Sequence, residues 1–71
     1  MIREGTKVQW NYSGSTATGK VKEVFHKEVT RTVQGNEVTR KASDDEPAYL
    51  IEQDDGDEVL KSASEIERAD D

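Results

Sequence analysis

Apolar and polar side chains alternate near the start of the chain. Val8, Trp10 and Tyr12 take every second position, which is the spacing of side chains that share one face of a β-strand. The pattern predicts a strand over residues 6–12, and the Ser-Gly-Ser sequence that follows favours a turn. We therefore expect a second strand to follow directly.

The second predicted strand spans residues 17–25 and contains a break in its pattern. Gly19 and Val21 fit one face, but Val24 and Phe25 are adjacent apolar residues. A β-bulge or a sharp bend would explain the break, and such bends allow a short sheet to curl into a barrel. We therefore expect the strand to bend near these two residues.

A hairpin is predicted over residues 28–42. Gly35-Asn36 supplies a two-residue loop with glycine first, as a type II′ turn requires. In that register the facing pairs are Val33 and Val38, Arg31 and Arg40, and Val29 and Ala42. Opposed arginines repel each other, so either the register differs or an anion lies between them. The acidic run at residues 44–46 and a ligand phosphate or carboxylate are the two candidates for that anion.

The second half of the chain adds further strands and a helical turn. Residues 48–51 are the most apolar run and predict a central strand. Asp55-Gly56 predicts the turn that leads to a returning strand over residues 58–61. Residues 62–65 read Ser-Ala-Ser-Glu, which is the spacing of a capping box and predicts one helical turn with Ile66 turned inward.

Together these elements predict an all-β domain, a small five-stranded antiparallel barrel of SH3-like or Tudor type with a short C-terminal helical turn. We expect a single domain over residues 1–71, ordered over about 5–67, with a frayed tail at 68–71. The 28–42 hairpin should reach beyond the barrel. The predicted core residues are Trp10, Val21, Val24, Val33 or Val38, Tyr49, Ile51, Leu60 and Ile66.

Composition on its own argues for disorder. Val, Ile, Leu and Phe supply 13 of the 71 residues, and the formal net charge is −6. A strongly apolar fraction below about 20% with a high net charge is typical of disordered chains. The alternation and the turn signals outweigh this, and the same scarcity predicts that nearly every large side chain belongs to one thin core.

Charge is unevenly distributed along the chain. Residues 1–43 carry eight basic and four acidic side chains, whereas residues 44–71 carry two basic and twelve acidic ones. Basic strands could pair with acidic strands inside one small domain, or the two halves could form faces that address different partners. We favour the first explanation, because most charged side chains are simply solvated.

Several functional classes are excluded or disfavoured. The chain has no cysteine, hence no disulfide, thiolate zinc site or cysteine nucleophile, and its one histidine, His26, rules out a multi-histidine metal centre. The acidic run at 54–58 lacks EF-hand spacing. No enzyme activity, metal or cofactor is predicted. Neither an apolar stretch of about 18 residues nor a secretory signal is present, so we expect a cytoplasmic protein.

Five motifs spread over residues 5–67 form a recognisable set. They are Gly5-x-x-Val8-x-Trp10, Gly19-x-Val21-x-x-Val24, Arg40-x-Ala42-Ser43-x-Asp45-Glu46-Pro47-Ala48-Tyr49, Gln53-Asp54-Asp55-Gly56 and Lys61-Ser62-Ala63-Ser64-Glu65. With these motifs the chain resembles the Tudor-like domain family named after fungal hypervirulence-associated proteins, which is common in bacteria as a free-standing protein of unknown function. The resemblance implies a Tudor-like, SH3-type barrel and implies no reaction.

The predicted function is that of a non-enzymatic interaction module that binds a protein or peptide partner. Tudor-type barrels can hold a methylated lysine or arginine in an aromatic cage, where ring faces attract the cation. The candidate ligand-binding residues are Trp10, Tyr12 and Tyr49. Because the chain has only four aromatic residues, we expect Phe25, Tyr49 and Trp10 to be needed in the core, which leaves Tyr12 free.

Nucleic-acid binding is the alternative function. Lys20, Arg31 and Arg40 lie in the basic first part of the chain and are the candidate phosphate contacts. The overall charge of −6 opposes this alternative, because nucleic-acid binding normally needs a basic surface, and such contacts would be strongly weakened by salt. A monomer with no membrane partner is expected in either case.

Overall fold

The structure, a computed structural model, describes residues 2–69 and is all-β. Seven strands and one 3-10 turn are present in this part of the chain. In order they are β1 (Lys7–Tyr12), β2 (Ser15–Phe25), β3 (Val29–Val33), β4 (Asn36–Arg40), β5 (Ala48–Gln53), β6 (Glu58–Ser62), η1 (Ala63–Glu65) and β7 (Glu67–Arg68).

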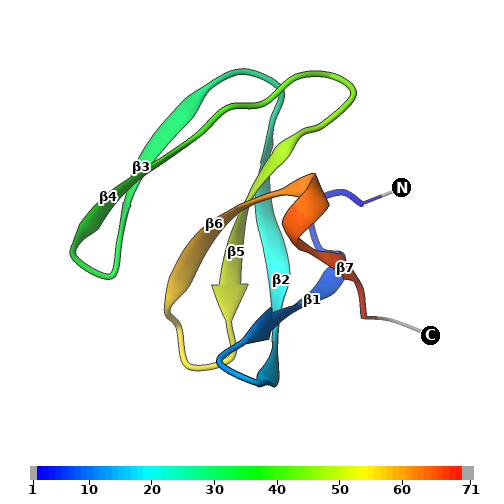
Figure 1. Ribbon diagram of the computed structural model, residues 1–71, viewed down its shortest axis with the longest axis vertical. Coiled ribbons are helices and arrows are strands. Elements are labelled where there is room, and N and C mark those ends of the chain that lie inside the picture. Colours follow the sequence, from blue (N-terminus) through cyan, green and yellow to red (C-terminus); the bar gives the residue numbers. More distant parts are fainter. Residues whose placement is uncertain (1, 70–71) are drawn as a thin grey trace.

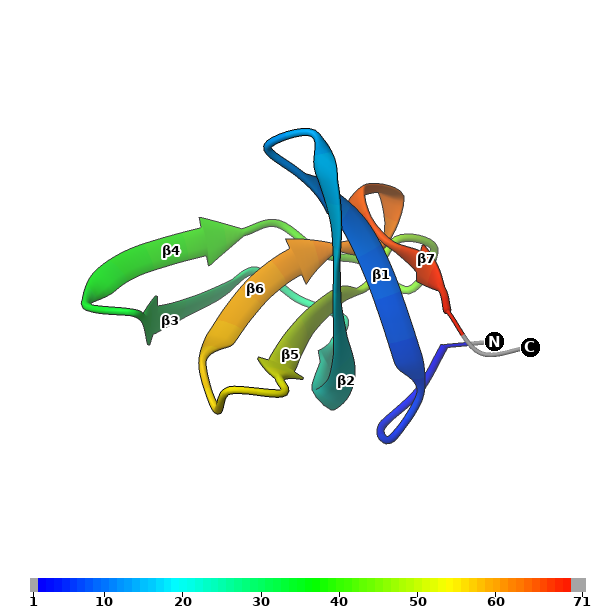
Figure 2. The same ribbon diagram turned by 90° about the horizontal axis from the view of Figure 1, so that it is seen from below.

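Five of the strands form one antiparallel sheet in the order β6-β5-β2-β1-β7, while β3 and β4 form a separate two-stranded sheet beside it (Figure 1). After β6, at one edge of the larger sheet, the chain passes through η1 to β7 at the other edge. The prediction of a closed five-stranded barrel is therefore wrong in two respects, since the larger sheet is not closed and seven strands replace five. The β3–β4 hairpin lies beside β6, and β7 lies beside β1 at the opposite edge of the larger sheet (Figure 2).

Strand β2 bends at a β-bulge. Its register with β5 shifts between Val21 and Glu23, so one residue of β2 is left over in the ladder. As a result Val21 and Val24 both contact one hydrophobic cluster, while the next residue, Phe25, contacts another. The bend predicted from the adjacent apolar pair is confirmed.

Strand β5 is buried on both faces and separates two hydrophobic clusters. Side chains alternate across a strand, so Tyr49 and Ile51 share one face while Ala48 and Leu50 share the other. The first core contains Val8, Trp10, Val21, Tyr49 and Ile51. The second core contains Val29, Val33, Ala48, Leu50 and Leu60, and it lies between the hairpin and the larger sheet.

The prediction of one thin core is therefore wrong. Most of the predicted members are buried, namely Trp10, Val21, Val33, Tyr49, Ile51 and Leu60, while Val24, Val38 and Ile66 lie at the margins. Four buried residues were not predicted: Val8, Val29, Ala48 and Leu50. The second core holds three of these four, because the sequence pattern did not indicate that the hairpin folds back over the sheet.

The loop of the β3–β4 hairpin differs from the prediction. Val33 pairs with Asn36, so the loop residues are Gln34 and Gly35. Both have positive φ, 50° and 80°, as a type I′ turn requires. This turn matches the right-handed twist of the flanking strands, and it replaces the predicted type II′ turn at Gly35-Asn36.

The new register separates the two hairpin arginines. Arg31 faces Val38 and Arg40 faces Val29, so each guanidinium lies across from an apolar side chain. The predicted Arg31–Arg40 opposition is wrong, and no anion is required between them. Val29 and Val33 lie four residues apart on β3, so they share one face of the strand and both pack in the second core.

Gln34→Asn is expected to stabilise the protein by about 0.5–1 kcal/mol, because Asn tolerates positive φ better than Gln and Asn-Gly is the preferred type I′ pair. Gln34 Nε2 donates to the Glu58 carbonyl at 3.4 Å, a long and weak hydrogen bond, so its loss in the variant should cost little stability. Urea unfolding measures the effect. Gln34→Ala, the control, should not stabilise, and a less stable Gln34→Asn variant would contradict the type I′ assignment.

Two ion pairs and one histidine–carboxylate contact join the basic first part of the chain to its acidic second part. The ion pairs are Lys22 Nζ–Glu58 Oε2 at 2.6 Å and Arg40 Nε–Glu65 Oε1 at 3.0 Å, and the contact is His26 Nδ1–Asp44 Oδ1 at 3.6 Å. Lys20 of β2 also lies opposite Glu52 of β5. The structure therefore favours the explanation in which the two segments neutralise each other within one domain.

The C-terminal segment is paired with β1. Arg68 lies opposite Val8, and the Ala69 amide donates to the Lys7 carbonyl at 2.9 Å. The tail predicted to fray from residue 68 is thus paired as far as Ala69. The rest of that tail, residues 70–71, lies outside the described residues.

Candidate ligand-binding groove

Two of the three predicted ligand-binding rings lie inside the first core. Trp10 is 6% exposed and Tyr49 is 4% exposed, and burial raises the pKa of the Tyr49 hydroxyl. Tyr12, at the end of β1, is 66% exposed. A cage built from these residues would require two core side chains to leave their places, so the structure does not bring the three rings together at the surface.

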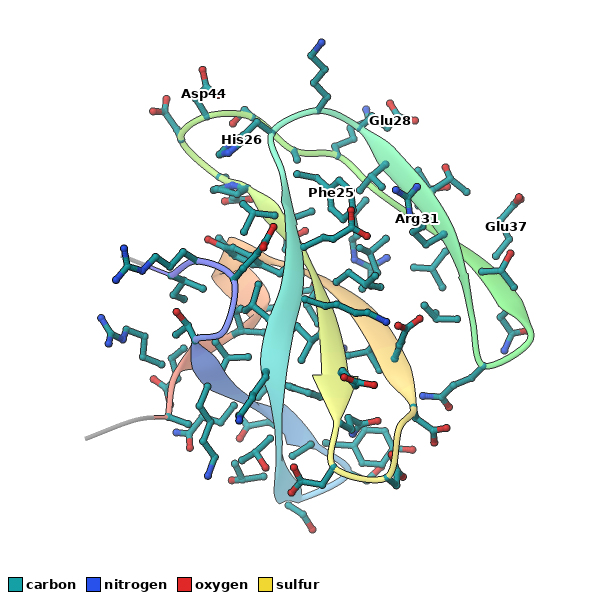
Figure 3. All side chains as sticks on the ribbon, turned by 180° about the vertical axis from the view of Figure 1, so that it is seen from behind. Phe25, His26, Glu28, Arg31, Glu37 and Asp44 are labelled. Carbon is teal, nitrogen blue, oxygen red and sulfur yellow. The ribbon has the colours of Figure 1, made fainter. Side chains whose placement is uncertain are left out.

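The fourth ring, Phe25, occupies a different environment. It is partly buried at the margin of the second core instead of within it. The guanidinium carbon of Arg31 lies over this ring, 4.8 Å from its centroid, which is cation–π geometry. Figure 3 shows the two side chains together between β2 and β3. Phe25 was missed as a site residue, although the break in alternation at Val24 and Phe25 was the available signal.

A groove of about 470 Å³ lies between the end of β2 and the start of β3, and we name it the Phe25 groove. Its lining residues are Val24, Phe25, His26, Lys27, Glu28, Val29, Thr30 and Arg31. Apolar side chains from both strands provide one part of this lining, and the connecting loop provides charged groups (Figure 3). Concave sites with an apolar surface and a few polar groups are typical of ligand binding.

Arg31 contributes hydrogen-bond donors to the Phe25 groove. Its Nη1 donates to the Thr30 carbonyl at 3.0 Å, and no ion pair to Arg31 or to Lys27 forms within residues 2–69. A guanidinium has five N–H donors in a fixed plane. One face of the Arg31 guanidinium lies on the Phe25 ring, and its N–H groups point outward in the guanidinium plane. Most of them therefore remain available to a ligand.

The loop between β2 and β3, which lines the Phe25 groove, contacts the acidic run at residues 44–46. His26 Nδ1 lies 3.6 Å from Asp44 Oδ1, and both side chains are exposed (Figure 3). The acidic run therefore contacts His26, and not the two arginines as the sequence suggested. Glu28 adds one negative charge to the lining of the groove.

The three predicted phosphate contacts have three different environments. Lys20 lines a shallow pocket with Glu52 and Asp54 at the turn between β5 and β6. Arg31 lies over the Phe25 ring, whereas Arg40 is engaged by a carboxylate of η1. The structure thus does not gather these side chains into one basic stripe, and their role in nucleic-acid binding stays a prediction.

Glu65 fixes β4 to the turn η1. Its Oε1 accepts hydrogen bonds from the Arg40 guanidinium at 3.0 Å and from the Ser62 amide at 2.7 Å. The second of these is the reach-back contact predicted from the capping-box spacing. Burial works to raise the pKa of the Glu65 carboxyl, but the Ser62 amide, the Arg40 guanidinium and the Lys61 charge outweigh it, so this pKa lies below its ordinary value.

This lowered pKa predicts an acid-sensitive contribution to stability. The folded state favours the ionised Glu65, so its contribution is present above the ordinary pKa of 4.5 and is lost as the pH falls through the lower folded-state value. Glu65→Gln should remove about 0.2–1 kcal/mol at neutral pH and much less at the acid end, since an exposed ion pair is worth little. Urea unfolding of both proteins from pH 7 to pH 3 measures this, and parallel curves would contradict it.

Residues 2–69 contain no group of three or more aspartate, glutamate and histidine side chains that could hold a metal ion. In the same part of the chain, no helix has the length and apolar character needed to cross a membrane. The imidazole of His26 and the carboxylate of Asp44 are both solvent-exposed.

The family of the chain follows from comparison with known proteins. No curated protein and no solved structure matches it. The family model for the TUDOR domain of hypervirulence associated proteins matches residues 5–66, which include β1 to β6, η1 and the whole Phe25 groove. The match covers most of the sequence and agrees with the resemblance carried by its motifs. The chain belongs to the hypervirulence-associated protein TUDOR domain family.

Proposed function

We propose that this protein is a non-enzymatic interaction module that binds a peptide segment of a protein partner in the Phe25 groove. Membership of a Tudor-like family supports a small binding module. The observation that carries the proposal is the Phe25 ring, which lines an open groove beneath the Arg31 guanidinium. Aromatic and arginine side chains are enriched among residues that dominate binding energy.

The incomplete burial of Phe25 supports this role. Each core already contains five buried hydrophobic residues, and smaller side chains such as Val29 are almost fully covered. Full burial of an aromatic ring would add stability in proportion to the apolar area removed from water, about 25 cal/mol per Å². A partner that covers the exposed part of Phe25 recovers this free energy on binding.

The test is selection of peptides from a randomised heptapeptide display library on the folded protein. Synthetic copies of the selected peptides are then titrated into ¹⁵N-labelled protein. We expect the largest amide shift changes within residues 24–31. Selected peptides that shift only other surfaces, or a library that yields no binder, would contradict the proposal.

Two matched variants make the test specific. Phe25→Leu keeps an apolar side chain at the second core and removes the ring, so affinity should fall about tenfold or more, which corresponds to about 1.4 kcal/mol. Tyr12→Leu removes an exposed ring elsewhere and should leave the affinity unchanged. Equal losses in both variants would also count against the groove.

A further inference from the structure

The outer edge of β3 carries unpaired backbone groups next to the Phe25 groove. In a two-residue hairpin the pair beside the loop, here Val33 and Asn36, is a hydrogen-bonded pair, and such pairs alternate along the ladder. The N–H and C=O groups of Thr30 and Thr32 therefore point away from β4. No third strand pairs with β3 in the described residues, and Thr30 lines the groove. One wall of the groove is thus a strand edge that pairs with no further strand in the described residues.

Each edge of the hairpin has an arginine over one outward carbonyl. Arg31 Nη1 donates to the Thr30 carbonyl at 3.0 Å, and Arg40 Nη1 donates to the Thr39 carbonyl at 3.1 Å. A carbonyl covered in this way cannot accept a hydrogen bond from an added strand without displacing the arginine. Both edges are therefore protected, as exposed edges in native proteins usually are.

The two arginines are held with different strength. On the β4 edge, Arg40 is fixed by the ion pair with Glu65, at 3.0 Å. On the β3 edge, the Arg31 guanidinium rests on the Phe25 ring and forms no ion pair within residues 2–69. Displacing Arg31 breaks no salt bridge, so the β3 edge is the one that can open to a partner.

We propose that an extended acidic peptide segment adds to the outer edge of β3, pairs with the backbone of Thr30 and Thr32, and binds the Arg31 guanidinium through a carboxylate. This rests on the proposed function and names the charge class and the binding mode of its ligand. Arg31 exchanges one hydrogen bond to a neutral carbonyl for a bidentate, charge-assisted contact. The same movement frees the Thr30 carbonyl to accept from a peptide N–H.

The remaining features of the groove fit such a ligand. Side chains of an added strand alternate in direction, so apolar residues two positions before and after the acidic one share its face and can contact Phe25 and Val24. Lys27 supplies a second cation to the lining, opposed by Glu28. The net charge of −6 repels an acidic peptide at long range, but at 0.15 M salt the screening length is about 8 Å and nearby charges dominate.

Three synthetic probes test the proposal by ¹⁵N amide titration at 0.15 M salt. The first is acetyl-Thr-Val-Thr-Glu-Thr-Val-Thr-amide, in which the glutamate and the two valines take alternate positions and therefore share one face of the strand. The second replaces the glutamate by glutamine. The third keeps the acidic sequence but carries N-methyl groups on its central backbone amides, which removes the donors needed for strand pairing.

We expect the acidic probe to shift the Thr30 and Thr32 amides, and both modified probes to bind about tenfold more weakly or worse. Arg31→Gln should lower the affinity for the acidic probe to that of the glutamine probe. Arg3→Gln, which removes an exposed arginine far along the sequence from the groove, is the matched control and should have no effect.

The possible failures have distinct meanings. Equal binding of the acidic and glutamine probes, or wild-type affinity in Arg31→Gln, would overturn carboxylate recognition. Equal binding of the N-methylated probe would overturn strand addition, and so would an acidic probe that leaves residues 24–32 unshifted. In each case the proposed function survives if library-selected peptides bind the groove, and it fails separately if they do not.

Discussion

Gly19→Ala is expected to lower the free energy of unfolding by about 2–3 kcal/mol or more. A Cβ at this position would lie 2.6 Å from Ile51 Cγ2 and 2.7 Å from the Glu52 carbonyl oxygen. The second contact is with backbone in the β2–β5 ladder, so relief requires the two strands to separate. Overpacking of a well-packed interior typically costs about 1–3 kcal/mol, and a contact with fixed backbone belongs at the upper end.

Urea or thermal unfolding measures this effect, and Gly14→Ala is its comparison. Gly14 has φ of +79° and open space around its Cβ position, so alanine there should cost only about 1 kcal/mol of backbone strain. The Gly19 variant therefore measures the cost of a steric clash, and the Gly14 variant measures the cost of backbone strain. A Gly19→Ala protein as stable as wild type would contradict the close packing of β2 against β5.

Leu60→Ala is expected to cost about 2–5 kcal/mol, the usual range for deleting a buried leucine side chain. Leu60 is 2% exposed and lies in the second core, beneath the hairpin. No backbone ladder ties β3 and β4 to the larger sheet, so this core is their principal anchor. The variant should therefore loosen the hairpin more than the rest of the domain.

Amide hydrogen exchange resolves that difference. In Leu60→Ala, amides of β3 and β4 should lose protection before those of β1 and β2. Val59→Ala, one residue earlier in β6, removes a partly buried side chain from the first core and should leave the hairpin less affected. If hairpin protection falls equally in both variants, or in neither, the two cores are not separate as described.

Local pattern was sufficient to predict most strands and turns. Alternation at Val8, Trp10 and Tyr12 marked β1, and the adjacent Val24 and Phe25 marked the bend in β2. These features depend on side-chain direction within one strand, which the sequence encodes directly. The family resemblance, carried by motifs along the whole chain, was also confirmed.

The hairpin register did not follow from the local turn preference. Glycine at the first loop position favoured Gly35-Asn36, whereas the structure uses Gln34 at positive φ, a residue with no preference for that conformation. The predicted and observed registers differ by two residues on β4, since Val33 faces Asn36 and not Val38. Both registers leave Val29 and Val33 on the same face, so the hydrophobic pattern did not distinguish them.

The candidate site was the least predictable part. The sequence pointed to Trp10 and Tyr49 as binding residues, but both side chains are buried in the first core. It also placed Arg31 opposite Arg40 in the hairpin. Phe25 and Arg31 meet because the bulge turns Phe25 to the face that carries the second core, and because the hairpin folds over that face. The bend was predicted from the adjacent apolar pair, but the position of the hairpin is a long-range contact that spacing in the chain does not contain.

Isotope-filtered nuclear Overhauser measurements on labelled protein with the unlabelled acidic peptide test the central claim most directly. The account predicts contacts from peptide valine methyls to the Phe25 ring, together with contacts from peptide Hα protons to the Thr30 and Thr32 backbone. Contacts confined to the surface around Tyr12, or to the turn that contains Lys20 and Asp54, would contradict it.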